Sequence, residues 1–145
     1  MPGPVGTSLR RRAIVVHGRD DVAVVARLSL ELEIPVTLLT APGAADYAGP
    51  DVLLAMVRHG LAEAPESDVE AVIDCADAAG RALAALRAGW TRVLFTGSAE
   101  TAARLADIAQ QCGATLLTER PEARDAGGDA IDAVRLRNWL YAVTA

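Results

Sequence analysis

The residues in this chain that could do chemistry follow short apolar runs. His17 follows the run at residues 13–16, Asp74 ends the run at residues 70–74, and Cys75 comes directly after it. A carboxylate beside an imidazole raises the imidazole pKa and fixes its tautomer, which makes a general acid or base. A cysteine near a helix N-terminus has a lowered pKa. The sequence therefore predicts His17, Asp74 and Cys75 as candidate catalytic residues.

Thr96, Gly97 and Ser98 form a second candidate site, between an apolar run at residues 92–96 and a helical pattern. A glycine at such a turn lets an anion approach the backbone, and the helix N-terminus supplies N–H donors. Arg120 follows the last apolar run and could neutralise the charge. We expect these four residues to bind a phosphate or carboxylate. In the alternative, Gly97 only serves the turn and Ser98 only caps the helix.

Some of these residues resemble the pattern of response-regulator receiver domains: Asp74, Thr96 and an Arg-Pro pair at 120–121. The resemblance implies a phosphorylated aspartate at Asp74 and a phosphate-reading hydroxyl at Thr96. A His-Gly pair at 17–18 stands where the family has paired acids, and arginine replaces its switch lysine. Because the paired acids would bind Mg²⁺ in the family, and Asp20 and Asp21 are displaced from their place by several residues, the alternative is a degenerate receiver-like domain that is not phosphorylated.

Apolar runs and helical patterns alternate along the chain and would position these residues. The runs, typical of strands buried on both faces, cover residues 13–16, 36–40, 70–74, 92–96 and 114–118. Helical patterns lie between them, and a last helix is predicted at about residues 129–142. A polar loop, ERPEARDAGG, precedes this helix. The pattern predicts five βα units in a row.

The (βα)5 pattern predicts a single α/β domain over residues 10–145, after a flexible tail at residues 1–9. Parallel strands need right-handed crossovers, and five strands are too few for an eight-stranded barrel. We expect a three-layer α/β/α fold with a five-stranded, doubly wound parallel sheet, flavodoxin-like in its order 2-1-3-4-5. In that order the first and third strands are neighbours, so His17 would lie beside Asp74. A half-barrel is the alternative.

The chain has no lysine, because all 14 of its basic residues are arginine. This excludes enzymes that form a lysine Schiff base and the Walker A phosphate loop. The net charge of −5 argues against nucleic-acid binding. Apolar stretches fall short of the ~20 residues of a membrane span.

Cys75 and Cys112 make no disulfide framework, so we expect a cytoplasmic location. His17 and His59 lack metal-ligand spacing, and no metal or cofactor is expected.

Two aromatic residues in the last helix suggest a partner. Trp139 and Tyr141 lie about 200° apart on a helix, so one of them faces outward or into an interface. We expect a homo-oligomer through this helix.

Two functions stay open on the sequence alone. One is binding of a small anionic molecule at the strand ends with acid/base chemistry, and the other is a non-catalytic interaction module.

Overall fold

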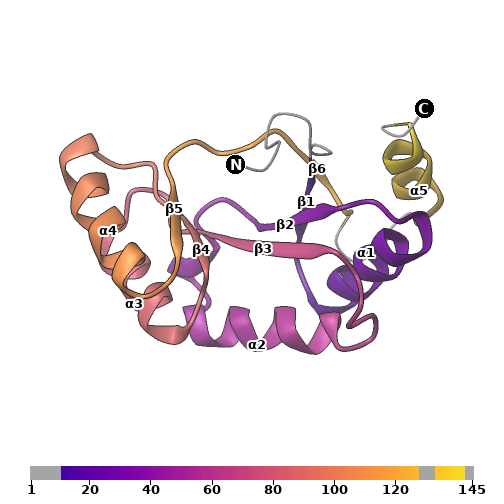
Figure 1. The fold of residues 1–145 in the computed structure, drawn as a ribbon, viewed down its shortest axis with the longest axis horizontal. Helices are drawn as coiled ribbons and strands as arrows, with labels where there is room; N and C mark the ends of the chain where they lie inside the picture. Colours follow the sequence, from indigo (N-terminus) through magenta and orange to yellow (C-terminus); the bar gives the residue numbers. More distant parts are fainter. Residues whose placement is uncertain (1–10, 128–132, 143–145) are drawn as a thin grey trace, which may run out of the picture.

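The computed structural model describes residues 11–127 and 133–142. The predicted tail at residues 1–9 and the predicted helix residues 129–132 lie outside the described part. Six strands form one parallel sheet on which the helices pack (Figure 1). The expected α/β class with an all-parallel sheet is confirmed. No helix in the described ranges is long and apolar enough to cross a bilayer.

The strands are β1 (Arg12–Val16), β2 (Val36–Thr40), β3 (Val69–Asp74), β4 (Arg92–Leu94), β5 (Thr115–Leu117) and β6 (Ala123–Asp125). The helices are α1 (Arg19–Leu32), α2 (Pro50–Leu61), α3 (Ala79–Ala88), α4 (Ala99–Gln111) and α5 (Ala133–Tyr141), with a short 3-10 turn, η2 (Ala44–Asp46), before α2. The first five strands match the predicted runs to within two residues at each end. The strand β6 was not predicted, because all three of its residues are exposed and carry no apolar pattern.

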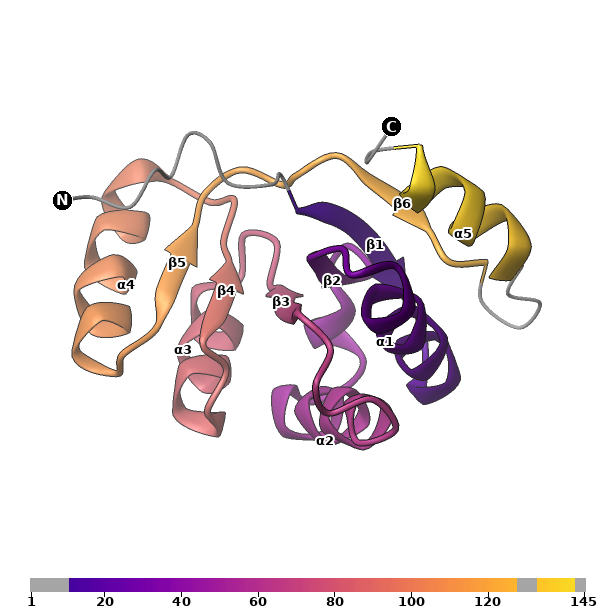
Figure 2. The same cartoon turned by 45° about the vertical axis from the view of Figure 1, so that its right-hand side comes forward.

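The strand order differs from the predicted 2-1-3-4-5. The observed order is β5-β4-β3-β2-β1-β6, which places β2 between β1 and β3. The crossovers from β1 to β5 therefore all step in one direction, and right-handed crossovers of this kind bring successive helices side by side. Accordingly α1 contacts α2, α2 contacts α3, and α3 contacts α4 (Figure 2). The flavodoxin-like order is wrong, and so is the receiver-like order, which is the same. The order of β1 to β5 is that of the half-barrel alternative, and β6 lies on the other side of β1.

Side chains of the sheet alternate between two apolar clusters. The larger cluster joins the strands to the helices, and from the strands it takes Ile14, Val16, Val36, Leu38, Ile73 and Val93. Leu39, Val72 and Leu94 form a smaller cluster with Leu117. Because successive residues of a strand point to opposite faces, this smaller cluster lies on the face turned away from the helices.

The connection from β5 to β6, residues 118–122, is called here the strap. It joins the two outermost strands of the sheet. Six Cα steps from Leu117 to Ala123 reach ~21 Å at most, whereas five strand spacings in a flat sheet measure ~24 Å. The sheet must therefore curve. Figures 1 and 2 show the strap crossing the open side of the curved sheet, opposite the helices.

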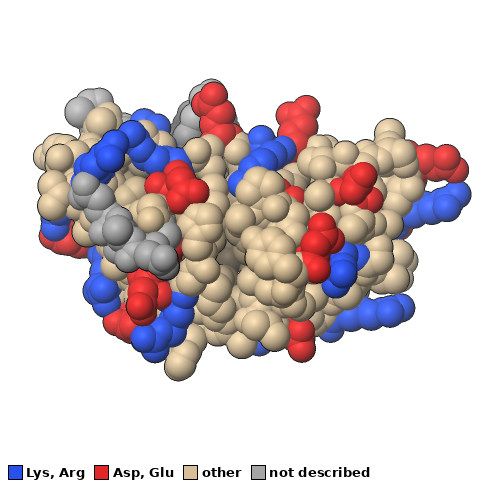
Figure 3. All heavy atoms as spheres, turned by 180° about the vertical axis from the view of Figure 1, so that it is seen from behind, with Lys and Arg blue, Asp and Glu red and all other residues tan. Residues whose placement is uncertain are grey.

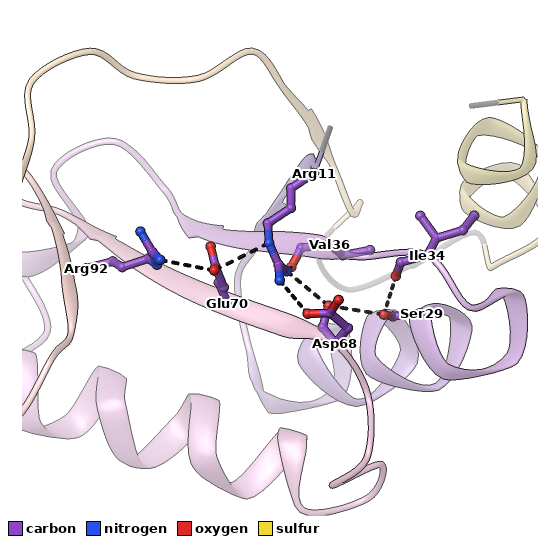
Figure 4. Close-up of polar contacts among 7 residues, drawn as sticks. All are labelled: Arg11, Ser29, Ile34, Val36, Asp68, Glu70 and Arg92. Atoms are coloured by element: carbon purple, nitrogen blue, oxygen red, sulfur yellow. Dashed lines mark hydrogen bonds and ion pairs between the residues drawn. The ribbon is translucent and has the colours of Figure 1, made fainter. Parts of the chain in front are cut away.

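A polar network ties together the amino-terminal ends of the strands (Figure 4). The Arg11 guanidinium binds the Asp68 carboxylate and donates to the carbonyl oxygens of Val36 (3.2 Å) and Asp68 (3.1 Å). Oε1 of Glu70 accepts from Nη2 of Arg92 at 3.1 Å and lies 3.4 Å from Nε of Arg11. Polar groups at the amino-terminal ends of the strands of a βα fold commonly stabilise the fold. Here the network holds β1 to β4 in register.

Candidate functional site

The carboxyl-terminal ends of the strands, called here the carboxyl edge, carry most of the polar residues singled out from the sequence. His17 follows β1, Asp74 ends β3 and Thr96 follows β4. Arg120 lies in the middle of the strap. Ligands of parallel βα folds bind at this edge, so the position of these residues is that of a candidate site.

Asp74 and Arg120 form the central ion pair of the edge. Nη1 of Arg120 donates to Oδ2 of Asp74, whose side chain is 4% exposed against 27% for Arg120. Oδ1 of Asp74 accepts from the N–H of Ala76 at 2.8 Å, and the Asp74 N–H donates to Oγ1 of Thr40 at 2.9 Å. Both carboxylate oxygens and the backbone N–H of Asp74 thus have partners, and the carboxylate anchors the strap to the sheet through Arg120.

The turn after β3 supports this pair with an unusual backbone conformation. Ala76 has a φ of 50°, in the left-handed region that residues with a Cβ seldom adopt. Its N–H is held by Asp74, and its carbonyl oxygen accepts from the N–H of Thr96 at 2.8 Å. The two bonds stabilise the strained residue and connect the ends of β3 and β4.

His17 does not lie beside Asp74. Because β2 separates β1 from β3, two strand spacings, ~10 Å, lie between their ends. Nε2 of His17 lies 2.9 Å from each carboxylate oxygen of Asp125, which ends β6, the other neighbour of β1. The predicted pairing of His17 with Asp74 is wrong. Sequence reasoning missed Asp125 because it occurs in the polar loop ERPEARDAGG, where no strand pattern marked it.

A further carboxylate, Asp21 in the first turn of α1, also contacts His17. Its side chain is buried, and Oδ2 accepts from the His17 N–H at 2.8 Å. Burial raises the pKa of Asp21 despite this hydrogen bond and the charge of His17. For Asp125, burial also acts to raise the pKa, but the hydrogen bonds from the Gly127 N–H and from His17 prevail and lower it. The two carboxylates next to His17, one on its backbone N–H and one on its imidazole, thus have pKa values shifted in opposite directions.

Replacement of Asp21 by asparagine should change how stability depends on pH. The folded state keeps the Asp21 proton to higher pH than the unfolded chain, whose value is 3.8. The native protein therefore loses stability as the pH rises from 3.8 through the raised pKa of Asp21. Asparagine does not titrate and can still accept the His17 N–H. Relative to the wild type, Asp21→Asn should be more stable at pH 7 than at pH 4, measured by urea unfolding.

The control for that experiment is Asp20→Asn, because Asp20 is the exposed neighbour of Asp21 in the same helical turn. Because the Asp20 side chain is 85% exposed, Asp20→Asn should stay within about 0.5 kcal/mol of the wild type in each measurement. An equal difference at both pH values for Asp21→Asn would contradict the raised pKa of Asp21.

Cys75 is buried in the core between sheet and helices. Burial raises the pKa of its thiol to about 12, the charges of Asp74 and Asp46 add to the rise, and Arg81 opposes it. The prediction of a lowered pKa is therefore wrong. A thiol with this pKa is a poor nucleophile at neutral pH.

The turn from Thr96 to Ser98 has a packing and capping role. Oγ of Ser98 accepts from the Thr101 N–H at 3.2 Å, which confirms Ser98 as the N-cap of α4. A Cβ added to Gly97 would lie 2.3 Å from Cζ of Phe95, so the glycine makes room for that buried ring. The Thr96 side chain is exposed. These contacts account for the residue types without a ligand, so anion binding here remains a prediction.

A small cavity opens beside His17. Its volume is ≈ 50 Å³, and its lining includes Val16, Thr40, Tyr47 and Met56. A cavity of this volume has room for a water molecule or one small chemical group. Within the described ranges, no group of three or more His, Cys, Asp or Glu side chains could hold a metal ion.

A curved parallel sheet with its first five strands in chain order, and with polar residues gathered at the carboxyl edge, places the chain among half-barrel-like α/β proteins. No family model and no curated protein sequence matches it. One similar solved structure is a protein from Coccidioides immitis assigned as a fructose-1,6-biphosphate aldolase, with 19% sequence identity and a TM-score of 0.59. The match covers 94% of this chain and 53% of that one, so the chain spans about half the length of that protein. At this identity the likeness shows the fold alone.

Proposed function

We propose that this protein binds a small anionic molecule at the carboxyl edge, with His17 and Asp125 as an acid/base pair. The observation that carries the proposal is the contact between Nε2 of His17 and both carboxylate oxygens of Asp125, 2.9 Å each. The two side chains are 39% and 58% exposed, so a ligand can reach them. A carboxylate in this position orients the imidazole for proton transfer to or from a ligand.

The anion-binding half of the proposal rests on Arg120 and on the N-terminus of α4. Arg120 is only partly exposed, and its contact with Asp74 leaves further N–H groups of the guanidinium for a ligand. Thr96 and Ser98 are exposed at the start of α4, and the helix dipole favours negative charge there. Asp74 is a positioning residue in this arrangement, because it holds Arg120 and is itself almost fully buried. Cys75, with its raised pKa, takes no part.

The experiment that tests the proposal is a thermal-shift screen with phosphorylated and carboxylated small molecules. The panel includes fructose 1,6-bisphosphate, because the similar solved structure is assigned to an aldolase of that sugar phosphate. A ligand at one hundred times its Kd should raise Tm by about 9 °C. The rise should be much smaller in His17→Gln and unchanged in His59→Gln, since His59 lies on the exposed side of α2. If no anion of the panel and no sulfate raised Tm, the proposal would fail.

An oligomeric interaction module is a second candidate function. Val134 and Tyr141 on α5 are 66% and 61% exposed, a large apolar exposure for a nine-residue helix. Such side chains are enriched in the centres of protein interfaces. Light scattering of the native chain measures this directly. A dimer that Val134→Glu dissociates would support it, and a monomer at high concentration would exclude it.

A further inference from the structure

A groove lies at the amino-terminal end of β1 and β6, away from the carboxyl edge. Its volume is ≈ 760 Å³, within the range of small-molecule sites. The lining consists of arginines, one tryptophan and short segments of the strap and the strands: Arg11, Arg12, Ala13, Pro121, Glu122, Ala123, Arg124 and Trp139. The groove is therefore rich in groups that bind anions.

Three elements bring two guanidinium groups to one aromatic ring in this groove. Arg124 in β6 lies opposite Ile14 in β1, and Arg12 is two residues before Ile14, so both arginines point to the same face of the sheet. On that face Trp139 of α5 packs against the core. Cζ of Arg12 lies 4.4 Å from the centroid of the Trp139 ring, and Cζ of Arg124 lies 5.5 Å from it.

Within residues 11–127 and 133–142, no carboxylate balances the charges of these two arginines. Among the described residues neither Arg12 nor Arg124 forms an ion pair, whereas Arg11 in the same groove pairs with Asp68 and Glu70. A guanidinium stacked on an indole uses its flat face for the contact and keeps its in-plane N–H groups for hydrogen bonds. Two such cations near one ring repel each other, and an oxyanion bound to both guanidinium groups reduces the repulsion. Figure 3 shows arginine side chains gathered at the upper left, around α5.

We propose that Arg12 and Arg124 bind the oxyanion group of a small molecule, a phosphate or a carboxylate, in this groove. Trp139 holds both guanidinium groups in place and forms one wall. The site is separate from the carboxyl edge and does not depend on the proposed function. Glu122 is the one carboxylate among the lining residues, so it weakens the binding of an anion.

The test is a titration of the ¹⁵N-labelled full chain with inorganic pyrophosphate and, separately, with citrate. The two indole N–H signals report different places, because Trp90 is buried with its Nε1 bonded to the Pro50 carbonyl oxygen (2.8 Å). The Trp139 signal, assigned by its loss in Trp139→Phe, should shift and saturate while the Trp90 signal stays in place. Sodium chloride at the same ionic strength should not reproduce the shift.

Variants identify the side chains. Arg12→Gln and Arg124→Gln should each weaken binding about tenfold, the usual effect of losing one charge-assisted hydrogen bond, and Glu122→Gln should tighten it. The matched control is Arg104→Gln, on the exposed face of α4, with unchanged affinity. A Trp139 signal that does not move, or that moves equally with chloride or in the double variant Arg12→Gln/Arg124→Gln, would overturn the proposal.

The same spectra separate this site from the carboxyl edge. The backbone amide signals of Gly97 and Ser98 lie at the carboxyl edge, and those of Arg12 and Arg124 lie in the groove. Shifts confined to Gly97 and Ser98 would support the proposed function and contradict the groove site. Shifts confined to Arg12 and Arg124 would support the groove site and contradict the proposed function.

Discussion

Replacement of Gly60 by alanine should lower the free energy of unfolding by about 2–3 kcal/mol. Gly60 lies in α2 where this helix packs against α1. An added Cβ would lie 2.6 Å from Cβ and Cγ1 of Val22 and 2.8 Å from the carbonyl oxygen of Arg19. Val22 is completely buried, and the Arg19 contact is backbone, so neither atom can move aside without shifting a whole helix. The first two helices would therefore be forced apart.

The matched control is Gly80→Ala in the first turn of α3. No atom lies within 4 Å of a Cβ added to Gly80, and the residue is exposed. The same substitution there should raise the free energy of unfolding by about 0.5–1 kcal/mol, because alanine restricts the unfolded chain more than glycine does. Urea unfolding followed by circular dichroism measures both variants. Equal effects of the two substitutions would show that α1 and α2 do not pack as closely as described.

Arg120→Leu should lower the free energy of unfolding at pH 7 by about 3 kcal/mol, because it leaves the carboxylate of Asp74 buried without a charge partner. Asp74 is 4% exposed, and its Oδ2 has Arg120 as its ion-pair partner. The substitution also frees the strap from the sheet beneath it. Leu39, Val72 and Leu94 on that face should then exchange their amide hydrogens faster.

The double variant Asp74→Asn/Arg120→Leu distinguishes the lost charge pair from a simple loss of packing. Since it removes both charges, it should be more stable than Arg120→Leu alone, and a double-mutant cycle gives the coupling between the two residues. If Arg120→Leu unfolded at the same urea concentration as the wild type, the ion pair would not exist in solution. Ligand titrations of Arg120 variants need this stability measurement beside them, because Arg120 both holds the strap and belongs to the proposed site.

The sequence alone predicted the strands and helices well where side chains carry a local signal. The run Val36–Thr40 matches β2 at both ends, because a strand covered on both faces is apolar throughout. Ser98 was predicted as a cap, and its hydroxyl accepts the expected backbone N–H. The three-residue strand β6 was missed, because an exposed edge strand carries no apolar signal.

The candidate site was only partly predictable. The sequence placed His17, Asp74, Thr96 and Arg120 at the ends of apolar runs, and the structure has them at the carboxyl edge or in the strap above it. Which of them meet depends on strand order. With β2 between β1 and β3, Asp74 pairs with Arg120 from a distant segment, and His17 pairs with Asp125 instead.

The sequence by itself therefore determined the α/β class and the parallel strands of this protein, and it showed that every basic side chain available to bind an anion is an arginine. Only the tertiary structure decided the strand order, the curvature and the partners of His17 and Asp74. The physical reason lies in the parallel ladder. Its hydrogen bonds join backbone groups that every residue but proline possesses, and buried strands of valine, leucine and isoleucine pack equally well beside several neighbours. The choice among neighbours depends on how all the helices pack together, which no single segment of the sequence reveals.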